Sequence, residues 1–293
     1  MIRYDSVQDL VELAEARQLK ISALVLADQA KQMGLSEEAL YNQMEDSFDT
    51  MIASTRSGLN PDLRSTSGLT GGEGAKVMAY ADRKEGGLAG EFFTRAIARG
   101  MATANCNAAM GKIVASPTAG SCGIIPGALV SLYEDKKFPK RDVVMSLFTA
   151  GAFGMIIANK ASISGAEGGC QAECGSASGM AAAALVELQG GSPKACADAL
   201  GMALINQMGL ICDPVAGLVE IPCIKRNAAG VSIAICSATM ALAGVELHIP
   251  ADECIQVMKS VGDHMNPDFK ETAKGGLATT PTGLRLKEKI FGA

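Results

Sequence analysis

Large aromatic side chains are nearly missing from this sequence, and this scarcity limits the folds it can adopt. Its 293 residues include no tryptophan, and aromatic residues make up only 4% of the chain. Apolar residues reach 48%, so the core has to be built from Ala, Leu, Ile, Val and Met, with 33 glycines allowing close backbone contacts. A β-sandwich uses more aromatic and β-branched residues. We therefore expect a mainly α fold, a compact multi-helix domain with Gly-rich functional loops between the helices.

A run of positive charge is also missing. The formal net charge is −5 and the basic residues are scattered, whereas nucleic-acid-binding proteins carry a clustered basic surface. The N-terminal segment MIRYDSVQDLVE lacks the basic-then-apolar pattern of a targeting peptide. The uncharged stretch Val143–Ala158 is shorter than the roughly 20 residues of a membrane span, which predicts a buried core helix. We expect a cytoplasmic protein with no nucleic-acid partner and no membrane contact.

Several common catalytic and nucleotide-binding motifs are absent as well. GxxxxGK(S/T) and GxGxxG do not occur, and there is no GxSxG elbow. The two histidines, His248 and His264, form no HExxH motif. Lys76 and Lys112 lie near Gly-rich loops, but nothing singles out either one as a pyridoxal phosphate lysine. The sequence therefore gives little support to a hydrolytic triad or to structural zinc.

Two loops of small residues are present, STSGLTGG (65–72) and SPTAGSCG (116–123). Glycines let the backbone come close to a ligand, while hydroxyl and N–H groups can bind an anion. Such loops suit a carboxylate or a phosphate, although each one alone is equally compatible with an ordinary turn.

The helical pattern divides the chain into a small cap and a larger core. Ser6 with Asp9 resembles a capping box before a helix, and Ser36 begins a second amphipathic helix. Glu91–Val114 is also predicted to be helical. We expect one domain over 1–293, with an N-terminal helical cap over 1–56 and the core over 57–293.

Nine cysteines, an odd number, do not indicate a disulfide scaffold, and free thiols are typical of a reducing cytoplasm. Cys170, Cys212 and Cys223 stand in Gly/Ala-rich, charge-poor stretches, but their separations of 42 and 11 residues match no standard zinc or ferredoxin pattern. Prolines beside the last two break helices, and free backbone N–H groups at a helix break favour a thiolate. The remaining thiols are expected to be buried packing groups, except that Cys174 shares a helix face with Cys170. The packing thiols are Cys106, Cys122, Cys196, Cys236 and Cys254.

Two cationic side chains and an amide follow shortly after Cys223: Lys225, Arg226 and Asn227. They can stabilise a cluster or a substrate carboxylate, and a surface turn is the alternative with about equal weight.

Long segments of the chain resemble the α chain of bacterial iron–sulfur L-serine dehydratase (L-serine deaminase). They are STSGLTGGEGAK, NAAMGKIVASPTAGSCGIIPG, FTAGAFGMIIANKASISGAEGGCQAECGSASGMAAA, GLICDPVAGLVEIPCIKRNAAG and GGLATTPTG. The resemblance implies a [4Fe–4S] cluster held by Cys170, Cys212 and Cys223, and no pyridoxal phosphate. It makes 57–293 the catalytic, cluster-binding core and leaves Cys174 as a non-ligand.

The implied activity is L-serine ammonia-lyase, which converts L-serine to pyruvate and ammonia. Three thiolates leave one iron open to act as a Lewis acid on the substrate hydroxyl, while the loops hold the substrate. The candidate substrate-binding residues are Ser65, Thr66, Ser67, Thr70, Gly71, Ser116, Thr118, Lys225, Arg226 and Asn227.

A general base is not identifiable in this chain. Single-polypeptide family members carry a GPSSSHT-type motif in a β region, and this sequence has none. The resemblance therefore implies a separate β chain and a hetero-oligomer. Those relatives also end in a cysteine that can reach the cluster, whereas this chain ends in KEKIFGA.

Other functions remain open at this point. A related cluster-dependent cysteine desulfidase or threonine dehydratase would use the same loops. A non-catalytic electron-transfer iron–sulfur protein is a more distant alternative, and a structural zinc protein is a weak third.

Overall fold

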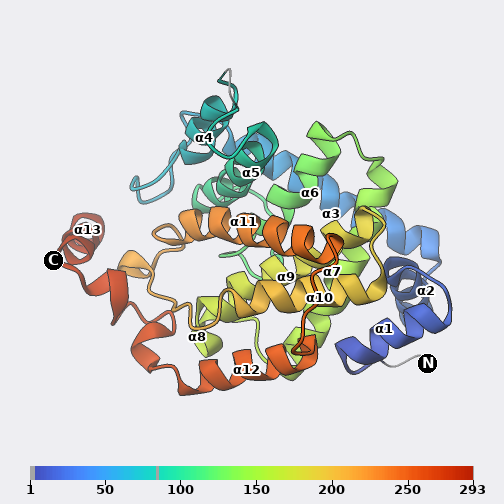
Figure 1. Cartoon of the computed structure of the whole chain (residues 1–293). Coiled ribbons are helices and arrows are strands. Elements are labelled where there is room, and N and C mark those ends of the chain that lie inside the picture. Colours follow the sequence, from blue (N-terminus) through green and yellow to red (C-terminus); the bar gives the residue numbers. More distant parts are fainter. Residues whose placement is uncertain (1–3, 84–85, 293) are drawn as a thin grey trace.

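The computed structural model describes residues 4–83 and 86–292, and its elements are helices joined by loops (Figure 1). Within these residues the only β pairing is an isolated parallel bridge between Cys212 and Lys270. The predicted mainly α fold is confirmed. The helices of the N-terminal half are α1 (Val7–Ala16), α2 (Ile21–Met33), α3 (Glu37–Gly58), α4 (Glu73–Ala81), α5 (Glu91–Ala108) and α6 (Ile124–Asp135). Those of the C-terminal half are α7 (Lys140–Lys160), α8 (Gly165–Gly168), α9 (Ser176–Leu188), α10 (Pro193–Ile205), α11 (Cys223–Leu242), α12 (Ala251–His264) and α13 (Pro281–Phe291).

Helix α9 forms the centre of the core. Apart from Glu187, its sequence, SASGMAAAALVEL, is apolar or small all the way round, and every one of its residues is buried. A helix of this kind has no solvent face and has to be surrounded. Helices α6, α7, α10 and α11 pack around it. The many alanines let these neighbours approach closely, so a core with few aromatic rings still fills its volume.

The uncharged stretch Val143–Ala158 lies in α7, as predicted. By length and composition this helix could cross a membrane, but 67% of its apolar window is buried inside the protein. It packs against α2 and α9. These contacts are typical of the core helix of a soluble protein.

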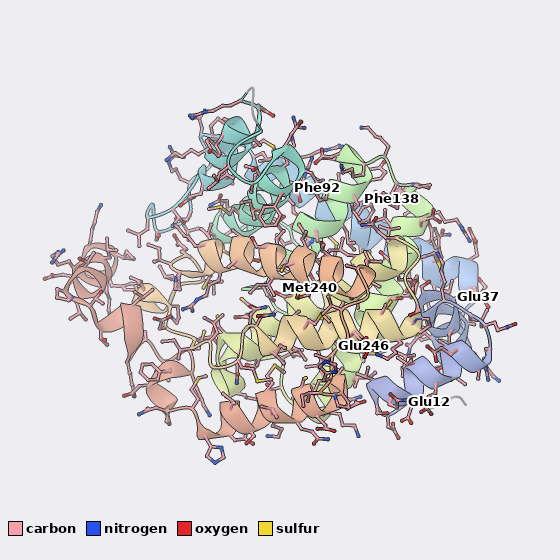
Figure 2. The ribbon with its side chains drawn as sticks, in the orientation of Figure 1. Glu12, Glu37, Phe92, Phe138, Met240 and Glu246 are labelled. Carbon is pink, nitrogen blue, oxygen red and sulfur yellow. The ribbon has the colours of Figure 1, made fainter. Side chains whose placement is uncertain are left out.

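The first helices begin where their capping residues predict. The Ser6 side chain accepts a hydrogen bond from the Asp9 N–H, and Ser36 accepts one from the Ala39 N–H. Figure 2 shows Glu12 and Glu37 on the outer faces of these helices. Helix α2 was not predicted, because a lysine without a side-chain capping bond precedes it.

Helix α5 ends earlier than the sequence predicts. The expected helix over Glu91–Val114 stops at Ala108. Met110 adopts a left-handed conformation with φ 61°, and the Gly111 N–H turns back to the Cys106 carbonyl. Gly111, just past the helix end, was a usable stop signal that the prediction passed over. The early end releases 109–123 as the loop that reaches the centre of the protein.

A short 3₁₀ segment, η4 (Gly276–Thr279), and helix α13 form the C-terminal end of the chain. Helix α13 packs on η4 and on a second 3₁₀ segment, η2 (Val215–Gly217). Figure 1 shows α13 at one side of the molecule, at the edge of the helical body.

Candidate metal centre and its loops

The folded chain gathers thiols from three segments into one buried site. Cys170 precedes a π-helical turn, η1 (Gln171–Gly175), Cys212 lies in the extended segment bridged to Lys270, and Cys223 is the first residue of α11. Their exposed fractions are 0%, 3% and 5%. Sequence reasoning placed both later cysteines at helix breaks. The structure agrees for Cys223, but the Cys212 N–H is bonded to the Phe269 carbonyl and is not free.

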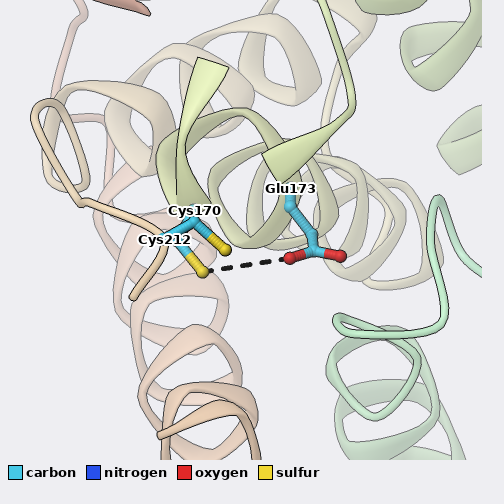
Figure 3. Close-up of side chains that lie close together, drawn as sticks. All are labelled: Cys170, Glu173 and Cys212. Atoms are coloured by element: carbon cyan, nitrogen blue, oxygen red, sulfur yellow. Dashed lines mark hydrogen bonds between the residues drawn. The ribbon is translucent and has the colours of Figure 1, made fainter. Parts of the chain in front are cut away.

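Cys170, Cys212 and Glu173 form a group that could hold a metal ion, with their ligand atoms all within 4.8 Å of one another. Figure 3 shows the two sulfur atoms facing the Glu173 carboxyl. Cys223 is not within this tight group. Burial raises the pKa of Cys223, and the nearby charge on Cys170 raises it further.

Cys170 is the thiol most easily ionised here. Its Sγ lies 4.0 Å from the Cys174 Sγ and 3.5 Å from Arg226 Nη1. Hydrogen bonds from the Cys174 and Cys212 thiols, together with the Arg226 charge, lower the pKa of Cys170. The same contacts raise the pKa of Cys174 and of Cys212. One thiolate is therefore favoured before metal arrives, and the other thiols would lose protons on binding it.

Arg226 is fixed by the protein on both sides. Its Nη1 donates to the Ile211 carbonyl at 2.9 Å, and its Nη2 donates to Asp213 Oδ1 at 2.8 Å. The other Asp213 oxygen accepts the Leu277 N–H at 2.7 Å. This predicted substrate residue thus contacts the Cys170 sulfur and links it to η4. Outer partners of this kind orient metal ligands.

Glu173 is a site residue that the sequence reasoning missed, although a carboxylate three residues after a candidate ligand was a usable signal. Thr118 donates a hydrogen bond to Glu173 Oε1. Burial and then the neighbouring Cys170 charge raise the pKa of Glu173 to about 7. A β carbon at Gly120 would stand 2.6 Å from Glu173 Oε1. Glycine at this position is what lets the 116–123 loop approach the Glu173 carboxyl.

The first Gly-rich loop folds over a second missed residue, Glu220. Ser67 Oγ donates to Glu220 Oε2 at 3.0 Å, and Thr70 Oγ1 donates to the same oxygen at 2.6 Å. The Ser65 and Ser67 hydroxyls are 3.2 Å apart, and Thr66 is exposed. Glu220 precedes Cys223 by three residues, so the loop is tied directly to the start of α11.

A third missed residue, Glu73, holds the end of the same loop. It accepts the Gly71 N–H at 2.7 Å and the Asn105 side-chain amide at 2.7 Å. Lys225, 54% exposed, lies 3.5 Å from its other oxygen.

The remaining predicted residues have mainly internal partners. Asn227 accepts the Gly123 N–H and donates to the Gly120 and Cys223 carbonyls, which clamps the 116–123 loop to α11. The buried Ser116 hydroxyl has no hydrogen-bond partner among the described residues. The substrate roles proposed for these residues stay predictions.

Thiols outside the site are buried with one exception. Cys106, Cys122, Cys196 and Cys254 are buried as expected, whereas the expectation was wrong for Cys236, which is exposed. Cys236 lines an apolar cavity of about 620 Å³, with Met240 and Glu246 (Figure 2). This cavity lies at the opposite end of α11 from Cys223, since residues in the C-terminal half of the helix line it. The residue expected to pack inside instead faces this cavity, which α10 and residues 245–249 also line.

Comparison with known proteins identifies the family. Residues 16–278 match the family model described as serine dehydratase alpha chain. The chain is 47% identical to a probable L-serine dehydratase, alpha chain, of Bacillus subtilis, over 99% of this chain and 96% of that protein. It is 40% identical to the L-serine dehydratase, alpha chain, of Peptoniphilus asaccharolyticus, over 98% of each. It is also 40% identical to the L-serine dehydratase of Streptomyces coelicolor, where 92% of this chain covers 59% of a longer protein. The chain belongs to the serine dehydratase alpha chain family.

Proposed function

We propose that this chain is the catalytic α subunit of an L-serine dehydratase, a carbon–nitrogen lyase that forms pyruvate and ammonia from L-serine in the cytoplasm. The observation that carries the proposal is the gathering of buried thiols beside two hydroxyl-rich loops. The names of the relatives over nearly the whole chain support the same activity.

The residues fit an iron–sulfur cluster. Thiolate ligands suit iron–sulfur clusters, and a structural zinc site would need four ligands closed around the metal. Gly165 supports the fit, because a β carbon there would stand 3.0 Å from Cys212 Sγ and 3.4 Å from Glu173 Oε2. The missing side chain leaves room beside the sulfur. Cys170, Cys212 and Cys223 would hold the [4Fe–4S] cluster, and Cys174 would stay outside its ligand set.

The chemistry of the reaction is removal of the substrate Cα–H and of its hydroxyl group. When bound, a cluster with an open iron supplies a Lewis acid for the hydroxyl. The chain's own residues bind and orient the substrate. The two Gly-rich loops are held rigidly by Glu220, Glu73 and Asn227, so that bound substrate would lose little further freedom on reaching a reactive geometry.

A separate β chain is part of this proposal. The relatives of full matching length are named as alpha chains, and the longer Streptomyces relative contains a region that this chain does not cover. Neither histidine of this chain is placed to act as the base. His264 Nδ1 is hydrogen-bonded to the Ser260 carbonyl on α12, and His248 lines the cavity at the C-terminal end of α11. We infer that the β chain supplies the base and that the active enzyme is a hetero-oligomer.

The test is anaerobic reconstitution of the chain with iron and sulfide, with and without the β chain, followed by a pyruvate assay on L-serine. We expect a high rate only when both chains are present. A full rate from the α chain alone would contradict the role given to the β chain. No pyruvate from either preparation would contradict the dehydratase activity.

A further inference from the structure

Glu220 is a buried residue whose carboxylate accepts hydrogen bonds on one oxygen only. It is only 4% exposed, and both hydrogen bonds from the Gly-rich loop reach Oε2. No group in the described part of the chain donates to Oε1. Oε1 is not one of the fully buried side-chain atoms that lack a partner, so it still reaches solvent and is open to a ligand that donates hydrogen bonds.

The direction of these hydrogen bonds decides what kind of ligand fits. A carboxylate can only accept, so Ser67 and Thr70 must both donate their protons to Glu220. The Ser67 oxygen in turn accepts from the Leu69 N–H at 3.1 Å and lies 3.2 Å from the Ser65 hydroxyl. Thr70 Oγ1 has no donor among the described residues. The surface beside Glu220 therefore offers acceptors, which attract a cation and repel an anion.

The other carboxylates near the site are already occupied or exposed. Both Glu73 oxygens have partners, and so do both Asp213 oxygens. Glu173 is bonded to Thr118 and faces the thiols. Glu271 lies beside Gly165 but is exposed. Among these carboxylates near the site, Glu220 is thus the buried one with an oxygen that no described residue occupies.

We propose that Glu220 Oε1 and Thr70 Oγ1 receive the α-ammonium group of the amino-acid substrate. The inference rests on the proposed function and deepens it, because it reverses the role expected for the 65–72 loop. That loop would select an amine and leave the substrate carboxylate to other donors. Glu220 would act as the specificity residue that separates amino acids from the matching hydroxy acids. Glu220 lies three residues before Cys223, and its carbonyl accepts the Ile224 N–H, so it belongs to the segment that starts α11 at that cysteine.

The experiment compares two unreactive probes, L-alanine and L-lactate, which share a methyl and a carboxylate group and differ in ammonium against hydroxyl. Binding to the reconstituted complex of both chains is measured by calorimetry and by inhibition of serine turnover. The wild-type complex is expected to prefer L-alanine. In E220Q, L-alanine binding should weaken roughly tenfold or more, as for a lost charge-assisted hydrogen bond, while L-lactate binding changes little. T70V should shift the preference in the same direction, and T70S should restore it.

E187Q is the matched control. Glu187 is also buried and also accepts from a threonine, Thr149, at 2.7 Å, but it caps α2 through the Ser22 N–H instead of facing the site. It should keep the wild-type preference. Equal weakening of both probes by E220Q would overturn the inference and make Glu220 a purely structural tie. Loss of the preference in E271Q but not in E220Q would also overturn it. A wild-type complex that binds both probes but forms no pyruvate contradicts the proposed function and leaves the binding result to be judged separately.

Discussion

At the scale of single residues, the proposed ligand set depends on the choice between two thiols, Cys174 and Cys223. The Cys174 Sγ lies 4.0 Å from the Cys170 Sγ, yet we assign the ligand role to Cys223. The reason is the resemblance of the segment EIPCIKRN to the family together with position, since Cys223 opens helix α11. The pKa does not separate the two thiols, because burial and Cys170 raise it for both.

The variants C223A and C174A show which of the two thiols is the third ligand. We expect C223A to lower iron affinity at least tenfold, since the loss of outer partners alone costs roughly 10–100-fold. C174A should retain iron close to the wild-type amount. Iron and sulfide content after anaerobic reconstitution measures both. If C174A loses iron and C223A keeps it, the third ligand is Cys174.

A variant at Gly120 tests the approach of the second loop to the Glu173 carboxyl. In G120A, the new methyl group would overlap Glu173 Oε1, and we expect a loss of about 1–3 kcal/mol of stability, as for overpacking. The denaturant midpoint of the protein without iron measures this loss. G151A is the control, because nothing lies within 4 Å of its β carbon in the middle of α7. It should stabilise the protein by about 0.5–1 kcal/mol. Equal midpoints for the two variants would contradict the close approach.

At the scale of elements, helix ends are held by residues distant in sequence. The N-terminus of α1 has its local cap at Ser6, and it also donates two N–H groups to Asp252 on α12. The Val7 and Gln8 N–H groups each lie 2.9 Å from the Asp252 oxygens. The local cap was readable from the sequence, and the distant one was not, because it joins positions 245 residues apart.

Removal of the distant cap, in D252A, should cost about 0.5–2 kcal/mol, the usual value of a side-chain helix cap. The measurement is the urea midpoint of unfolding. D263A is the control on the same helix, since Asp263 forms only an exposed pair with Lys259, and exposed pairs contribute about 0–1 kcal/mol. A D263A loss as large as that of D252A would count against the cap.

At the scale of the whole molecule, the thiol site joins three distant parts of the chain. One of the proposed ligand cysteines lies before α9, one lies beside the Phe269–Lys270 segment, and one opens α11. A cofactor that binds all three stabilises only the folded state, because the unfolded chain does not hold them together.

Removal of iron should therefore lower the melting temperature of the chain by several degrees. Each kcal/mol of stability shifts the midpoint by roughly 2–4 °C in chains of 150–250 residues. Differential scanning calorimetry under anaerobic conditions compares the reconstituted and the chelator-treated protein. In C223A the two preparations should melt together. An unchanged midpoint in the wild type would mean that the cofactor does not bridge these segments.

The sequence by itself determined the helical class, the buried α7 segment and the caps at Ser6 and Ser36, because these depend on local spacing and composition. It also singled out the three cysteines, through the segments around them. Only the tertiary structure decided what surrounds them. Glu173 and Glu220 contact the loops across 55 and 153 residues of sequence, and Glu73 contacts Asn105 and Lys225 across 32 and 152 residues. Such long-range polar contacts leave no periodic pattern, so their partners become readable only when the helices are packed.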